Sequence, residues 1–194
     1  MSKVDPSISK KERNKTIKWV VTIFIVTILV SGMISFASNE IMAQSTILIA
    51  FVILLLIILI GIIFDIIGMA VASADEKPFH SMAARKVPGA QEAIRLLRNA
   101  ERVSSICNDV VGDICGVVSG SASAAIAAQV LENFSFSWPG MITLLMSALV
   151  AGLTVGGKAI GKTFAIKSCT KIVHTVGKFL WSLRNFPKSL KKNK

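Results

Sequence analysis

Long runs of apolar residues, separated by polar or charged segments, dominate the pattern along the chain. Four of them are long enough to cross a bilayer, at residues 17–37, about 46–72, about 106–131 and about 139–165. A membrane-spanning helix needs about 20 predominantly apolar residues, and a span in lipid must satisfy its own backbone hydrogen bonds. The pattern therefore predicts an all-α membrane protein with about four transmembrane helices.

Two charged segments, 76–104 and 167–185, carry apolar residues at helical spacing. In the first, we expect Pro88 in the first turn of a helix. In the second, apolar positions lie opposite Lys171 and Lys178, a pattern typical of an interfacial helix that is attracted to anionic lipid. We expect both segments to be juxtamembrane amphipathic helices.

The third run combines small residues with ionisable ones. Gly112, Gly116 and Gly120 recur at four-residue steps, which lets helix backbones approach closely in a bilayer. We therefore predict that this stripe packs against another helix, within the subunit or across a dimer interface. Asp109 and Asp113 lie one turn apart on the neighbouring stripe, and ionisable groups at membrane depth usually face a bundle interior or a watery cavity.

Charge predicts the topology. The chain of 194 residues is 53% hydrophobic with a net charge of +11, and its lysines and arginines fall in the tails 1–16 and 186–194, in the amphipathic segments, and at one end of the spans. The two short loops between spans contribute only Glu40 and Glu132. The positive-inside rule predicts a multi-pass plasma-membrane protein with both termini cytoplasmic, so residues 40 and 135 should be outside and residues 85 and 190 inside.

Other functional classes fit the sequence less well. The basic residues lack the aromatic interleaving of a single-strand nucleic-acid surface, so we expect no nucleic-acid partner. The three cysteines and two histidines show no zinc-ligand spacing and are interpreted as helix-packing residues. The sequence shows no pair of nucleophile and base that would form a catalytic triad. We therefore expect neither an enzyme nor an organic cofactor.

Several polar residues are predicted to lie at one depth near the cytoplasmic boundary. They are Asp65, Ser73, Asn108, Asp109, Asp113, Thr154 and Lys158. Together they would line one inward-facing cavity. A second interpretation is that Asp109 favours a helix N-terminus and that Lys158 extends to the interface. If Lys158 lies within about 4 Å of Asp65 or Asp109, the attraction is substantial at an intermediate dielectric, and the lysine would compete with a divalent ion.

Three motifs in order resemble the transmembrane domain of the cyclin M and CorB/CorC magnesium transporters. They are FDIIGMAVASAD at residues 64–75, ICND at 106–109 and GKAIGKTFA at 157–165, beside FSGSEMALLS, IGNN and GEILPKTLA in the family. The resemblance covers roughly residues 46–185, with the run at 17–37 as an extra span. The later motif contains Gly157, Gly161 and Lys162.

The resemblance implies a homodimer with three core spans per subunit and a divalent-cation site open to the cytoplasm, with Asn108 among the ligands. The chain departs from the family where carboxylate or hydroxyl ligands are expected. Asp65, Ile67 and Gly68 replace two serines and a glutamate, and Lys158 replaces the acidic residue of GEILPK. The family's cytoplasmic CBS pair does not follow in this chain, so a separate CBS-domain partner is a further expectation.

Three functions remain open at this stage. The first is a transporter or exchanger of divalent cations, magnesium with cobalt as an alternative, with Asp65, Ser73, Asn108, Asp109 and Asp113 as candidate ligands. The second is a membrane partner or regulator that derives from this family and has lost transport. The third is a transporter of another solute, such as an anion drawn to Lys158.

Overall fold

The computed structural model is all-α and describes residues 6–43, 45–133 and 138–192. Four helical segments are long and apolar enough to cross a membrane, which confirms the predicted class. They are α1 (Pro6–Ala43), α2 (Ile47–Ser73), the continuous segment of α5 (Ala100–Ser105), the π-helix η1 (Ile106–Gly112) and α6 (Asp113–Asn133), and α7 (Pro139–Lys167).

The span α2 is the centre of the bundle and packs against α6, α7 and α8 (Cys169–Lys192). Toward one end, Leu54 and Ile58 of α2 are buried against Ile126 of α6 and Val150 of α7. Toward the other end, Val71 packs in a second cluster with residues of the amphipathic helices. A helix that is hydrophobic on all sides suits this central position, because both lipid and neighbouring helices accept its surface.

The helix α1 lies against α6, where Ile23 and Val30 pack on the cluster of Val110, Ile114 and Val118. Its apolar window is otherwise unburied within the chain, which agrees with a span outside the core. Near the other end of its apolar run, Trp19 lies under the guanidinium of Arg102, 5.5 Å from the ring centroid. A cation over an aromatic face adds a modest attraction.

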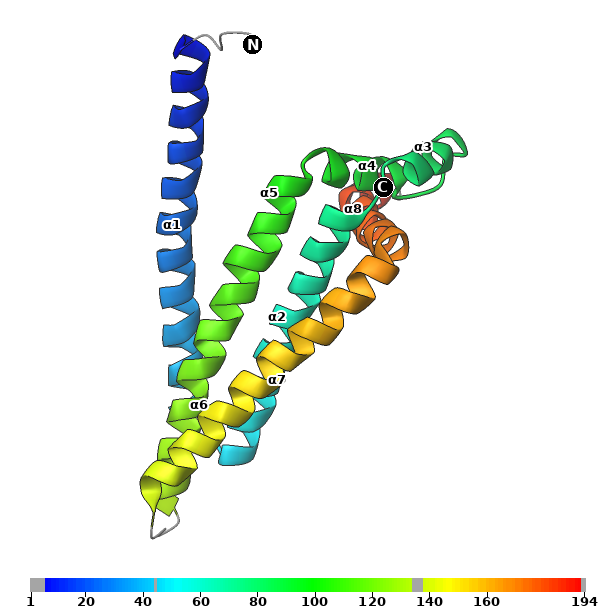
Figure 1. The fold of residues 1–194 in the computed structure, drawn as a ribbon. Helices are drawn as coiled ribbons and strands as arrows, with labels where there is room; N and C mark the ends of the chain where they lie inside the picture. Colours follow the sequence, from blue (N-terminus) through cyan, green and yellow to red (C-terminus); the bar gives the residue numbers. More distant parts are fainter. Residues whose placement is uncertain (1–5, 44, 134–137, 193–194) are drawn as a thin grey trace.

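Both termini lie at one end of the bundle, and the turns from α1 to α2 and from α6 to α7 lie at the other (Figure 1). Glu40 stands at the turn end of α1, whereas the amphipathic helices gather at the end of the termini. This arrangement gives the even number of crossings that the sequence predicts. Residue 135 lies outside the described residues.

Several helix boundaries differ from the expected ones. The tail predicted at 1–16 is helical from Pro6, and the segment 186–192 continues α8. Once a span has nucleated a helix, each further residue adds one hydrogen bond at little cost, and lysine, arginine and glutamate are good helix formers. The described parts of both predicted tails, 6–16 and 186–192, are therefore helical.

The predicted juxtamembrane segment 76–104 is divided into three helices. It consists of α3 (Lys77–Ala84), α4 (Ala90–Arg98) and α5. Lys86 and Gly89 have positive φ angles of 56° and 86°, a conformation that reverses the chain and ends a helix. Pro88 thus precedes the N-cap Gly89 and is not in the first turn of α4. The expected apolar face of α4 is confirmed, with Ala90, Ala93 and Ile94 buried.

Candidate functional site

A buried ion pair joins α2 to α7 at the level where the third span is irregular. The Asp65 carboxylate has an exposed side-chain fraction of 4%, and its Oδ2 lies 3.4 Å from Nζ of Lys158, which is 18% exposed. This confirms the predicted proximity of Lys158 and Asp65. Removing one partner of a buried pair leaves an uncompensated charge, so the two side chains depend on each other.

The third span contributes a carbonyl and a second carboxylate to the same ammonium. Lys158 Nζ donates a hydrogen bond of 3.1 Å to the carbonyl oxygen of Gly112 and lies 3.7 Å from Oδ1 of Asp113. Asp113 is 71% exposed. Gly112 closes the π-helical segment, and such segments are frequent at functional sites. Lys158 therefore has oxygen partners from α2, η1 and α6.

Gly112 is buried beside the ion pair, where any side chain would overlap the charged groups. A Cβ atom there would collide with Asp65 Oδ1 and would lie 3.3 Å from Lys158 Nζ. Gly112 was predicted to allow a close helix contact. It does so, because its missing side chain leaves room for the Asp65 and Lys158 side chains of two neighbouring helices.

Asn108 lies next to this pair on η1 and packs against α2. A Cβ at Gly68 would lie 2.8 Å from Cγ of Asn108 and 3.0 Å from Cβ of Cys107. The amide Nδ2 donates to Ser104 Oγ at 3.3 Å, whereas the buried Oδ1 has no hydrogen-bond partner among the described residues. A buried acceptor without a donor is unfavourable. The oxygen packs against Gly68, so it would have to turn away from α2 to accept from a solute or to ligate a cation.

Lys158 also lines a groove of about 350 Å³ between α6 and α7. Gly116 and Gly120 line this groove, and a Cβ atom on either would meet nothing within 4 Å. Thr154 lines it as well, with its hydroxyl bonded to the Val150 carbonyl at 2.8 Å. Within one chain, therefore, Gly116 and Gly120 do not pack against a helix as predicted, because α7 diverges from α6 at this level.

The structure does not bring two of the residues predicted for the cavity, Asp109 and Ser73, into the cluster, and the motif residue Lys162 also lies outside it. Asp109 is exposed and forms no ion pair with a described residue, and Ser73 and Lys162 are exposed. Ser73 lies eight residues beyond Asp65 on α2, which is about 12 Å along a helix. The second interpretation of Asp109 is also wrong, because it lies inside the continuous span that begins at Ala100 and not at a helix N-terminus.

Glycines of α7 have a packing role against α2. A Cβ at Gly157 would collide with Ile62 Cδ1, and one at Gly161 would lie 2.8 Å from Ile66 Cγ1. On the other side of α2, a Cβ at Gly61 would lie 2.8 Å from the Cβ of Cys115. All three cysteines are free, and Cys107 and Cys115 pack at helix contacts as interpreted.

The described residues contain no group of three His, Cys, Asp or Glu side chains arranged to hold a metal ion. The carboxylates of Asp65 and Asp113 both lie within 4 Å of the Lys158 ammonium, which occupies the position between them. Sequence reasoning missed the steric roles of Gly68 and Gly61, since a lone glycine in an apolar run gives no sign of which neighbour it faces. Comparison with family models, with curated proteins and with solved structures gave no match.

Proposed function

We propose that the protein is a plasma-membrane transporter of a divalent cation, magnesium or cobalt, with both termini cytoplasmic. The observation that carries the proposal is the buried Asp65 carboxylate, which pairs with Lys158 of α7. The same ammonium donates to the Gly112 carbonyl of the third span. Buried carboxylates within membrane spans are costly and mark ion pathways. Asn108, four residues before Gly112 on the same helical segment, brings a further side-chain oxygen that has no partner among the described residues, and magnesium prefers oxygen ligands.

Lys158 has a defined role in this proposal. Its ammonium balances the Asp65 charge when no cation is bound, and an entering cation must displace it toward the exposed Asp113. Because the displaced charge stays tethered nearby, cation affinity is low in the native protein. Low affinity suits a carrier, since the cation must also leave.

Replacing the tethered charge by a carboxylate tests the proposal. Lys158→Glu should raise magnesium affinity, because a third carboxylate joins Asp65 and Asp113, and magnesium prefers oxygen ligands. Isothermal titration and magnesium-dependent thermal shift measure this. Lys162→Glu makes the same charge change one turn along α7 on an exposed residue and should leave the affinity unchanged. Tight binding by the native protein that Lys158→Glu abolishes would contradict the role given to Lys158 and would leave a plain divalent-cation transporter.

A membrane partner without transport activity is the second candidate, and the filled site favours it. The ammonium already satisfies Asp65, and open glycines on α6 and α7, Gly116, Gly120, Gly152 and Gly156, would suit a second copy or another membrane chain. A homodimer or a separate CBS-domain protein belongs to this proposal. Magnesium flux in proteoliposomes separates the two candidates: flux that Asp65→Asn abolishes supports transport, and absence of flux supports the partner.

A further inference from the structure

A second hollow, away from the ion pair, lies where α8 meets α2 and α7. It has a volume of about 520 Å³ and is lined on its apolar side by Ile63, Ile66 and Ile67 of α2, Phe164 of α7, and Ile172 and Val176 of α8. The first four residues belong to helices that qualify as membrane spans. The apolar lining of the hollow is therefore continuous with surface that faces lipid.

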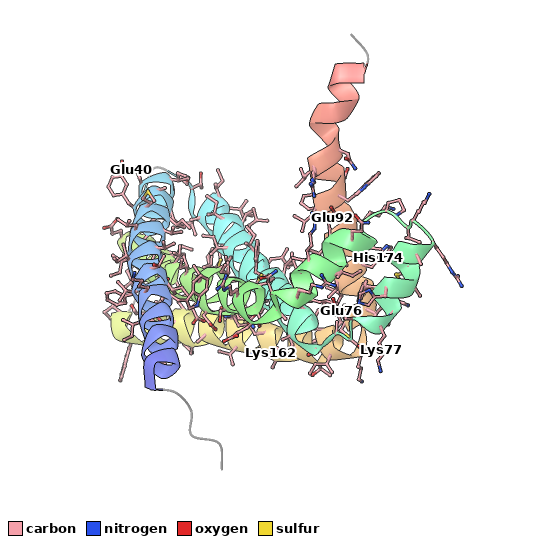
Figure 2. All side chains as sticks on the ribbon, turned by 90° about the horizontal axis from the view of Figure 1, so that it is seen from above. Glu40, Glu76, Lys77, Glu92, Lys162 and His174 are labelled. Carbon is pink, nitrogen blue, oxygen red and sulfur yellow. The ribbon has the colours of Figure 1, made fainter. Side chains whose placement is uncertain are left out.

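The orientation of α8 places this hollow at the membrane interface. Seen from the side and from above, α8 runs across the end of the bundle and away from it, transverse to the spans (Figures 1 and 2). Val173 of α8 is fully buried, and Arg184 Nη1 lies 3.5 Å from Oε1 of Glu92 on α4, which Figure 2 labels beside α8. These contacts fix one side of α8 against α4 and leave Ile172 and Val176 directed at the spans.

The rest of α8 continues this apolar side beyond the bundle. Phe179 and Leu183 are 63% and 56% exposed, and at helical spacing they share a side with Ile172 and Val176. The helix sequence contains no acidic residue. An amphipathic helix with these properties lies in the headgroup region with its apolar side toward the acyl chains.

The hollow also has a polar edge. Lys171, Ser168 and Thr175 line it, and the Thr175 hydroxyl donates to the Lys171 carbonyl at 2.9 Å. Lys171 is exposed and forms no ion pair with a described residue. The Thr175 hydroxyl hydrogen is thus used within α8, and the donors left for a phosphate are the Lys171 ammonium and the Ser168 hydroxyl. These donors at the rim of an apolar hollow match the phosphate and the chains of a phospholipid.

We propose that this hollow binds one anionic phospholipid, with an acyl chain between Ile66 and Val176 and the phosphate at Lys171. A neutral lipid with a choline headgroup fits less well, since its cation would add to the unopposed positive charge of α8. The site is independent of the Asp65 and Lys158 pair and does not rest on the proposed transport.

Binding can be measured on the full-length protein in detergent by native mass spectrometry and by thermal shift, with phosphatidylglycerol, phosphatidylcholine and inorganic phosphate as probes. We expect one phosphatidylglycerol per chain, weaker phosphatidylcholine binding and no stabilisation by inorganic phosphate. Lys171→Gln should weaken phosphatidylglycerol binding about fivefold, since one basic residue near a membrane surface contributes about that factor. Lys178→Gln removes the same charge from an exposed residue of α8 that does not line the hollow and should change binding less than twofold.

A second variant fills the hollow from its apolar side. Val176→Trp should abolish stoichiometric phosphatidylglycerol binding while the exposed basic residues remain. Equal losses in Lys171→Gln and Lys178→Gln would overturn the proposal in favour of diffuse attraction to charge. Equal binding of the two phospholipids, or full binding by Val176→Trp, would also overturn it.

Discussion

At the scale of single residues, the absence of a side chain at Gly112 decides whether the buried pair can form. A Cβ there would compete with Asp65 for the same space. We predict that Gly112→Ala lowers the stability by about 2 kcal/mol, because overpacking a tight contact displaces its neighbours. A thermal melt in detergent measures the change.

Gly116→Ala is the matched control for this prediction. It lies one turn further along the same span, where a Cβ meets nothing within 4 Å. Alanine also favours a helix by up to about 1 kcal/mol over glycine, so the melting temperature should stay constant or rise. A fall as large as that of Gly112→Ala would show that Gly116 packs against a second copy.

The mutual dependence of Lys158 and Asp65 is a second prediction. Lys158→Met keeps the length of the side chain but strands a carboxylate that is 4% exposed, at a cost of about 3 kcal/mol. Adding Asp65→Asn removes the stranded charge, so the double variant should regain most of the stability. Additive losses in this double-mutant cycle would mean that the two residues are not energetically coupled.

The sequence predicted the members of the pair better than their surroundings. Asp65, Asp113 and Lys158 stand out because charges are rare in apolar runs, and their depth follows from counting residues. Helix rotation does not follow from such a count, which is why Asp109 and Ser73 were expected in the cavity although both lie away from the ion pair. The π-helical segment at residues 106–112 changes the rotation further and has no signal in a single sequence.

At the scale of elements, the amphipathic helices followed from their periodicity, but their contacts with one another did not. Gly177 of α8 approaches α4 so closely that a Cβ would lie 3.0 Å from the Ala93 nitrogen and 2.5 Å from the Gly89 oxygen. Gly89 adopts a φ angle of 86°, a conformation that glycine accepts without strain. The contact therefore depends on two glycines that are distant in sequence.

We predict that Gly177→Leu releases α8 from α4. The larger side chain cannot enter the contact, and the only described ion pair of α8, that of Arg184 with Glu92, is exposed enough on the arginine side to contribute little alone. Trypsin should then cleave after Lys178 faster than in the native protein. Ser182→Leu, on an exposed residue of the same helix, is the control and should leave the cleavage rate unchanged.

At the scale of the whole molecule, the charges separate along the bundle axis. The end with both termini carries α3, α4 and α8 with their basic residues, and the opposite end holds the turns beside Glu40 and Glu132 (Figure 1). The hydrophobic pattern and the charge count contain this information in full. The same patterns do not indicate which helix α1 packs against, and its contacts within the chain are mainly with α6.

The last prediction concerns which end faces the cytoplasm. Because cytoplasmic segments carry an excess of lysine and arginine, a cysteine at position 40 should react with an impermeant maleimide on intact cells. A cysteine at position 85, which lies in the basic turn after α3, should react only after permeabilisation. Both are introduced in a background without Cys107, Cys115 and Cys169, so that every label reports on one position. Labelling of position 85 and protection of position 40 on intact cells would reverse the orientation and would place both termini outside the cell.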